Sequence, residues 1–149
     1  MARLRGVLAT TAEVALTTSL KTVLTIFNAA DRRTAIRGFS VSFDGVSSTA
    51  GGAEVTLVIH SSSGTFSAGT ISRDFRGTTE AFGSSGQFNA SAEPSITAIL
   101  RSYDVNQMTG YERAFAQDEE IELAGGERFG IQVRASSAVN CHAFMNLEE

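Results

Sequence analysis

Hydrophobic and small polar residues alternate most strictly in residues 37–45 of this chain. Phe39, Val41 and Phe43 are separated by single small residues, and an Asp-Gly pair ends the run. Side chains two positions apart in a β-strand lie on the same face, so this spacing puts three large apolar side chains on one face. Aspartate and glycine favour turns. The segment therefore predicts a half-buried strand that closes in a turn.

The same alternation recurs in other parts of the chain, most clearly in residues 54–60, 96–105, 128–135 and 139–147. Turns rich in glycine, serine and acidic residues separate these segments. About eight short strands with turns every 8–12 residues are typical of a β-sandwich, a jelly roll or a barrel. No helical pattern alternates with the strands, which argues against a βαβ architecture. The residues expected to face the core are Phe39, Val41, Phe43, Val55, Leu57, Ile59, Phe129, Ile131 and Val133.

Two regions depart from this alternation. Residues 17–30 contain apolar residues at helical spacing, but the β-branched pairs at 22–23 and 25–26 favour a strand, which we predict there. Residues 73–95 carry a thin hydrophobic pattern broken by glycines, and they contain the only proline, Pro94. Because long irregular loops are usually functional, we predict that this region is an interaction surface.

The first residues have a different character. Arg3 and Arg5 flank Leu4, and acidic residues are absent from this stretch. We predict an N-terminal arm over residues 1–12, followed by a single domain over residues 13–149. A short arm holds a partner through its charge or adds a strand to a partner's edge. Polar residues interrupt the apolar run, so we do not assign a signal peptide and expect the protein to be used inside the cell that makes it.

Composition and charge exclude two classes of partner. The 149-residue chain has a formal net charge of −4, whereas binding to nucleic acid needs clustered Lys and Arg to contact phosphates. No apolar run approaches the roughly 20 residues that span a membrane. Lys21 is the only lysine among 12 basic residues. Arginine is favoured in ion pairs at interfaces, although a high-GC genome produces the same bias.

The chain shows no pattern of residues that indicates catalysis. Cys141 is the only cysteine and stands beside His142, but neighbours in a strand point to opposite faces and cannot form a dyad. The only other histidine, His60, has no cysteine or carboxylate at metal-ligand spacing. The acidic residues at 118–122 lack the spacing of a calcium loop. We therefore expect no enzyme activity, no metal and no cofactor.

Four stretches resemble a known group of proteins. They are the run from Arg32 to Gly45, the run from Glu122 to Val133, the run from Ala138 to Ala143 and the closing pair Glu148–Glu149. These stretches resemble small structural proteins of tailed bacteriophages that decorate, or cement, the viral head. The resemblance covers about half of the chain and rests on strand-and-turn motifs rather than on a catalytic signature.

The resemblance implies a fold and a function. It implies a jelly-roll β-sandwich that forms a homotrimer on the outside of the virion and stabilises the shell. The implied partners are further copies of the chain and the major capsid protein, and the protein would be made in the host cytoplasm. We expect the capsid or subunit interface to involve the arm and the closing residues. These residues are Arg3, Leu4, Arg5, Glu148 and Glu149.

Other functions share the predicted fold. A carbohydrate-binding module is also a sandwich, but it normally presents exposed aromatic side chains to a sugar. This chain has no tryptophan and only two tyrosines, Tyr103 and Tyr111. A receptor-binding jelly roll used in signalling or adhesion is a further alternative.

Overall fold

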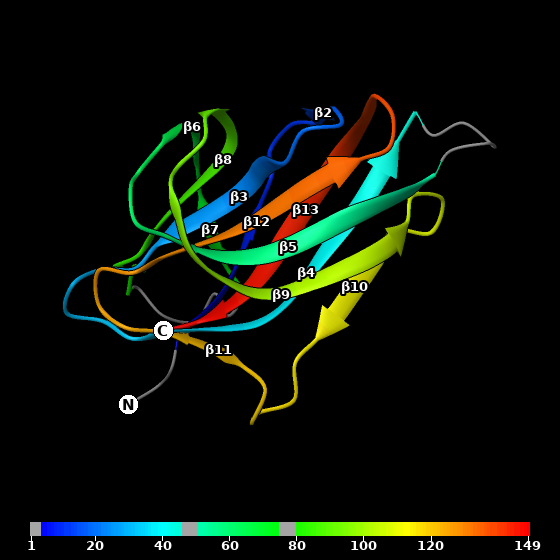
Figure 1. Ribbon diagram of the computed structural model, residues 1–149. Coiled ribbons are helices and arrows are strands. Elements are labelled where there is room, and N and C mark those ends of the chain that lie inside the picture. Colours follow the sequence, from blue (N-terminus) through cyan, green and yellow to red (C-terminus); the bar gives the residue numbers. More distant parts are fainter. Residues whose placement is uncertain (1–3, 46–50, 75–79) are drawn as a thin grey trace.

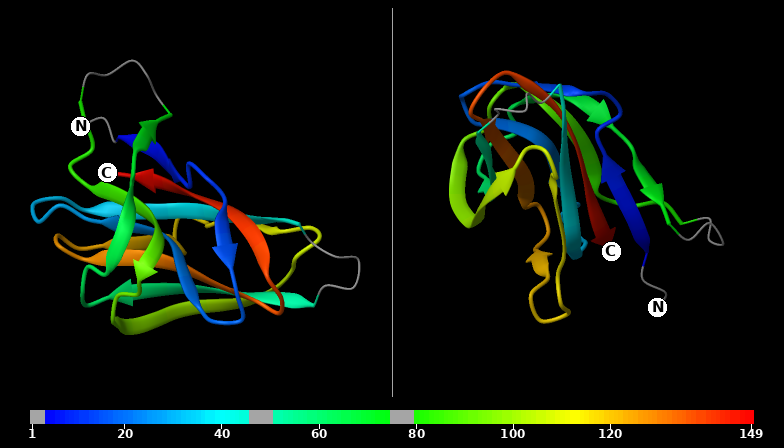
Figure 2. Two further views of the ribbon diagram at one scale, coloured as in Figure 1. Left: turned by 90° about the horizontal axis from the view of Figure 1, so that it is seen from above. Right: turned by 90° about the vertical axis from the view of Figure 1, so that its right-hand side faces the viewer.

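The computed structural model describes residues 4–45, 51–74 and 80–149. These residues form two antiparallel sheets that pack face to face, as seen in Figure 1 and end-on in the right-hand view of Figure 2. The prediction of an all-β sandwich is therefore confirmed. No helix in the described part of the chain is long and apolar enough to cross a membrane.

The two sheets differ in size. The first sheet has seven strands: β1 (Arg5–Ala9), β2 (Val14–Leu16), β4 (Thr34–Asp44), β7 (Ile71–Arg73), β10 (Tyr111–Ala114), β11 (Ile121–Leu123) and β13 (Val139–Glu148). The second sheet has six strands: β3 (Lys21–Phe27), β5 (Gly52–His60), β6 (Thr65–Gly69), β8 (Ser85–Ala92), β9 (Ile96–Asn106) and β12 (Arg128–Ala135).

The strand order is that of a jelly roll. The first sheet runs β10-β4-β13-β1-β7, and the second runs β6-β8-β3-β12-β5-β9. Eight of these strands, β1, β3, β4, β5, β9, β10, β12 and β13, form the jelly roll. In the first sheet, β1 pairs with β13, β13 pairs with β4, and β4 pairs with β10. These are the first, eighth, third and sixth strands of the set. In the second sheet, β3 pairs with β12, β12 pairs with β5, and β5 pairs with β9. These are the second, seventh, fourth and fifth strands of the set. Of these eight strands, β1 was not among the predicted ones, because its residues were assigned to the arm, and the other five strands of the described residues are short or inserted.

The core lies between the sheets and follows the predicted alternation. Seven of the nine residues expected in the core are fully buried, and Phe43 and Ile59 are partly buried against it. The strand predicted within residues 17–30 is present as β3. Cys141 lies in the same core, where burial raises the pKa of its thiol to about 12.

The segment predicted as an arm is largely part of the domain. β1 lies between β13 and β7, pairing Arg5 with Glu148 and Leu8 with Met145. The side chain of Leu8 is fully buried in the core. The apolar residues of this segment gain more from burial between the sheets than from extending into solvent. Residues 1–3, including Arg3, lie outside the described residues.

The region predicted to be irregular contains a strand, so the prediction of a continuous loop over residues 73–95 is wrong. β8 pairs with β3 and extends the second sheet, and β7 extends the first sheet beside β1. The sequence did not predict β8 because most of its residues are small and do not show an alternation of large apolar side chains. A Cβ at Gly86 would lie 2.3 Å from Cδ1 of Leu8, so the close packing of the two sheets requires glycine there.

The chain between β8 and β9 crosses the outer face of the second sheet. β8 lies beside β3, whereas β9 lies at the other edge beside β5, so the connection at residues 93–95 has to pass over the strands between them. This connection, which we call the crossover, can be followed in Figure 1 from β8 to β9. Near it, Thr22, Thr56, His60 and Gln132 are buried although they face away from the core.

Candidate interaction surfaces

The two chain ends meet in a cluster of paired charges. The N–H of Leu4 donates to the carbonyl of Glu149, and the N–H of Glu149 donates to the carbonyl of Leu4, each at 2.8 Å. The carboxylate of Glu148 forms ion pairs with Arg5, at 3.1 Å, and with Arg37. The start of β1 and the end of β13 lie side by side in the left-hand view of Figure 2. We call Leu4, Arg5, Arg37, Glu148 and Glu149 the terminal cluster.

The structure brings together four of the five residues predicted as an interface, but most of their groups are used within the chain. Leu4 and Glu148 are each only 5% exposed. Glu149 accepts hydrogen bonds from the N–H of Gly83 (2.8 Å) and from the N–H and hydroxyl of Ser84 (3.2 and 2.9 Å). Arg5 is the exposed member of the set. These residues fasten the ends of the domain, and in this arrangement they present little free surface to a partner.

A hollow of about 280 Å³ lies beside the terminal cluster. Its lining is Arg33, Thr34, Ala35, Glu120, Glu122, Glu148 and Glu149. Arg37 pairs with Glu120 at 3.2 Å, so part of the acidic lining is neutralised. In the parts of the chain that the structure describes, no three acidic, histidine or cysteine side chains come together in a way that holds a metal ion.

A second region, on β9, presents apolar side chains to solvent. Ile99 is 66% exposed, and Ile96 and Leu100 are each 40% exposed. β9 is the last strand of its sheet and pairs only with β5 among the described strands. An exposed apolar strand at a sheet edge is a site for association. We call these three residues the β9 surface.

Two bulges shape the β9 surface. In the pairing with β5, Val58 lies opposite Ile99 and Leu57 lies opposite Arg101, so Leu100 is an extra residue. A second register shift near the start of β9 leaves Thr97 without a partner residue, and its hydroxyl donates to the carbonyl of Ile59 at 3.2 Å. Bulges twist an edge and disrupt its ladder of hydrogen bonds. The β9 surface is therefore suited to side-chain packing rather than to the addition of a strand.

The charged side chains next to the β9 surface make contacts within the chain. Arg101 lies over the ring of Phe115, 4.7 Å from its centroid, and donates to the carbonyl of Glu119 at 2.9 Å. Arg113 forms an ion pair with Glu119 at 2.9 Å. This pair raises the pKa of Arg113 and lowers the pKa of Glu119. The surface thus offers apolar area without a strong net charge beside it.

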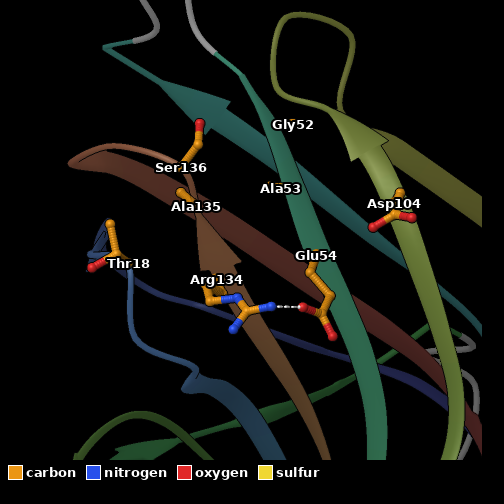
Figure 3. Close-up of a pocket in the computed structure, with 8 residues that line it drawn as sticks. All are labelled: Thr18, Gly52, Ala53, Glu54, Asp104, Arg134, Ala135 and Ser136. Carbon is orange, nitrogen blue, oxygen red and sulfur yellow. Dashed lines mark hydrogen bonds and ion pairs between the residues drawn. The ribbon is translucent and has the colours of Figure 1, made fainter.

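A larger hollow of about 480 Å³ lies where β5 begins and β9 and β12 end (Figure 3). It is lined by Thr18, Gly52, Ala53, Glu54, Asp104, Arg134, Ala135 and Ser136. Arg134 and Glu54 pair with each other across it, as the dashed line in Figure 3 shows. The lining contains a serine but no histidine or cysteine, so a side-chain nucleophile has no imidazole base beside it.

The three residues considered for nucleophilic or metal chemistry are far from forming a site. β13 directs Cys141 into the core and His142 to the opposite, exposed side. His60 lies on the second sheet, where burial lowers its pKa to about 4. Tyr103 and Tyr111, the aromatic residues considered for sugar binding, pack against each other at 5.1 Å between ring centroids and against Phe39.

The sequence did not single out the β9 surface. Strict alternation placed Ile96 and Leu100 on one face of the strand and Ile99 on the other, which leaves only one face exposed. The bulges break this alternation and expose residues 96–100 without a gap. The available signal was the presence of apolar residues on both faces of a strand that ends the sheet.

The chain matches no protein-family model, no curated protein and no solved structure. The geometry of these surfaces and the sequence motifs of the chain are therefore the basis for inferring its function.

Proposed function

We propose that this protein is a non-enzymatic structural protein that decorates the exterior of a bacteriophage capsid as a homotrimer. The observation that carries the proposal is the β9 surface, an exposed apolar strand on a domain whose chain ends are fastened internally. The resemblance to head decoration proteins supplies the capsid as the partner and the virion as the location.

The chemistry of the β9 surface favours a second copy of the chain as its occupant. Interfaces between identical subunits are more apolar than other protein interfaces, and charged residues are depleted at their centres. The nearby Arg113 and Glu119 form an ion pair, and Arg101 adds a single positive charge, so the β9 surface has little charge that would select a strongly charged ligand. In a closed ring of three, this surface would meet a different surface of the next subunit.

The remainder of the domain is consistent with a scaffold role. A decoration protein has to resist strain, and the two sheets enclose one continuous core from β1 to β13. The capsid contact remains assigned by resemblance to the arm and the closing residues. Because Leu4 and Glu148 are buried, we now expect the accessible contribution to come from Arg5.

Deletion of residues 2–6 would disturb the folded domain as well as the arm. Leu4 is buried, and Arg5 and Gly6 pair with Glu148 and Leu147 in β1. Such a deletion would remove packing and backbone hydrogen bonds together with any capsid contact. A substitution at Arg5 is therefore the cleaner test of the arm.

The proposal is tested by placing a charge on the β9 surface. We expect Ile99→Glu to convert the trimer to a monomer in light scattering coupled to size exclusion. We also expect the dissociation constant to rise at least about 100-fold, because the contact would bury an unpaired carboxylate. Particle occupancy, measured by gel densitometry after sedimentation with capsids, should fall in parallel.

Met108→Glu is the matched control. Met108 is also 66% exposed, but it lies in the turn after β9, roughly 20 Å along the strand from Ile99. This variant should remain trimeric and bind particles like the wild type. A wild-type protein that is monomeric at all concentrations, or an Ile99→Glu variant that assembles normally, would overturn the assembly proposal. A trimer that never binds particles would overturn the capsid assignment alone.

A further inference from the structure

His60 is a buried imidazole without a hydrogen-bond partner. It is the last residue of β5, it faces away from the core, and it is only 5% exposed. Neither ring nitrogen has a partner among the described residues. Buried polar groups are normally satisfied, and leaving one unpaired costs free energy. A side chain kept in this state requires an explanation.

The surroundings of His60 fit a neutral ring tightly. A Cβ at Gly130, on β12, would lie 2.1 Å from Nε2 of His60, so the ring occupies the space that any other residue would fill. Two charged groups influence the ring from neighbouring elements: Glu93 from the crossover and Arg128 from β12. β9 places the uncharged Ile96 opposite His60.

The crossover is fastened beside this ring by hydrogen bonds and by the side chain of Pro94, which is buried. The N–H of Ser61 donates to the carbonyl of Ser95 at 2.8 Å, and the N–H of Ser95 donates to the hydroxyl of Ser62 at 2.9 Å. The carboxylate of Glu93 accepts from the N–H of Thr22 at 2.9 and 3.1 Å and from its hydroxyl at 2.5 Å. A short segment held by a few hydrogen bonds and one buried side chain opens at lower free energy than a packed core.

We propose that His60 is an acid-sensitive latch, in which protonation of the buried ring releases the crossover at residues 93–95 from the outer face of the second sheet. The released segment would let water reach the imidazolium while the two packed sheets stay folded. The inference concerns the crossover alone and is independent of the proposed capsid function.

The direction of the pH effect follows from the burial of His60. Burial lowers the pKa of His60 from 6.5 to about 4 in the closed state, whereas a hydrated ring in the open state has an ordinary pKa. The open state therefore binds the proton more readily. The closed state keeps its full advantage above pH 6.5 and loses it as the pH falls toward 4. Between about pH 7 and pH 5, the opening equilibrium should rise about 20-fold.

Amide hydrogen exchange measures this opening directly. The N–H of Ser61 reports on the crossover, and the N–H of Ile131 in β12 reports on the core. Exchange rates are divided by those of an unstructured peptide at the same pH. We expect the protection of Ser61 to fall about 20-fold between about pH 7 and pH 5, while the protection of Ile131 stays constant.

Variants of the two histidines test which of them causes the pH dependence of the opening. In His60→Gln, the protection of Ser61 should no longer depend on pH, whereas His142→Gln should behave like the wild type, because His142 is exposed on the other sheet. If His60→Gln fails to fold, the comparison of Ser61 with Ile131 in the wild-type protein still tests whether the crossover opens at low pH while the core stays closed. A fall at Ser61 that persists in folded His60→Gln, an equal fall at both amides, or no fall at Ser61 would overturn the latch.

Discussion

The terminal cluster and the β9 surface are two opposite kinds of surface region. The terminal cluster is charged, and its side chains pair with one another across the two ends of the chain. The β9 surface is apolar and has neighbours on one side only. Charged residues at a chain end are conspicuous in a sequence, yet here they have partners within the domain. The comparison teaches that an interaction surface is better recognised by apolar area left uncovered than by charge.

This contrast predicts that the two regions fail in different ways. Substitutions in the terminal cluster should lower the stability of the isolated domain, and substitutions on the β9 surface should change only its association.

Truncation of Leu4 should have the largest effect. Leu4 is 5% exposed and lies at the start of β1, so Leu4→Ala removes buried methyl groups and leaves a cavity. We expect a loss of about 2–4 kcal/mol in the free energy of unfolding, measured in urea. Leu20→Ala makes the same chemical change at a side chain that is 37% exposed, and should cost less than about 1 kcal/mol. Equal losses in the two variants would mean that residue 4 belongs to a loose arm after all.

The fold was predictable because its main signal is local. Alternation such as that of Phe39, Val41 and Phe43 depends only on the two-residue period of a strand, and the sheets follow from it. The strand in residues 85–92 was missed because Gly86 takes a buried position, where the close approach of Leu8 leaves no room for a larger side chain. The burial of Gly86 depends on Leu8 and on β3, which are far away in the sequence.

The surfaces were less predictable than the fold. The sequence indicated the chain ends, but whether Glu148 faces a partner or another part of the same chain depends on the pairing of β1 with β13. The exposure of Ile99 depends on bulges in the pairing of β9 with β5 and on the position of β9 at the end of its sheet. The burial of His60 depends on neighbours that are far away in the sequence, such as Gly130 in β12. None of these long-range relations can be predicted from a local sequence pattern.

Removal of the charge of Glu148 should have an intermediate effect. Its buried carboxylate pairs with Arg5 and Arg37, so Glu148→Gln weakens two ion pairs while keeping the shape of the side chain. Both arginines are partly exposed to water, which screens the interaction, so we expect a loss of about 1–2 kcal/mol in urea unfolding. Glu122→Gln, at an exposed position in the same hollow, is the control and should change stability by less than about 0.5 kcal/mol. The assembly of Glu148→Gln should match that of the wild type.

Salt should have the smallest effect on assembly. The screening length falls to about 3 Å at 1 M salt, so contacts that depend on exposed charges weaken strongly as salt is added. A contact formed by Ile96, Ile99 and Leu100 contains no such charges, and the nearby Arg113 is already paired with Glu119. We therefore expect the dissociation constant of the trimer, measured by analytical ultracentrifugation, to change less than about twofold between about 0.05 and 1 M NaCl. In the same experiment, a tenfold weakening would show that charged residues such as Arg5 hold the subunits together, and the roles assigned to the two regions would have to be exchanged.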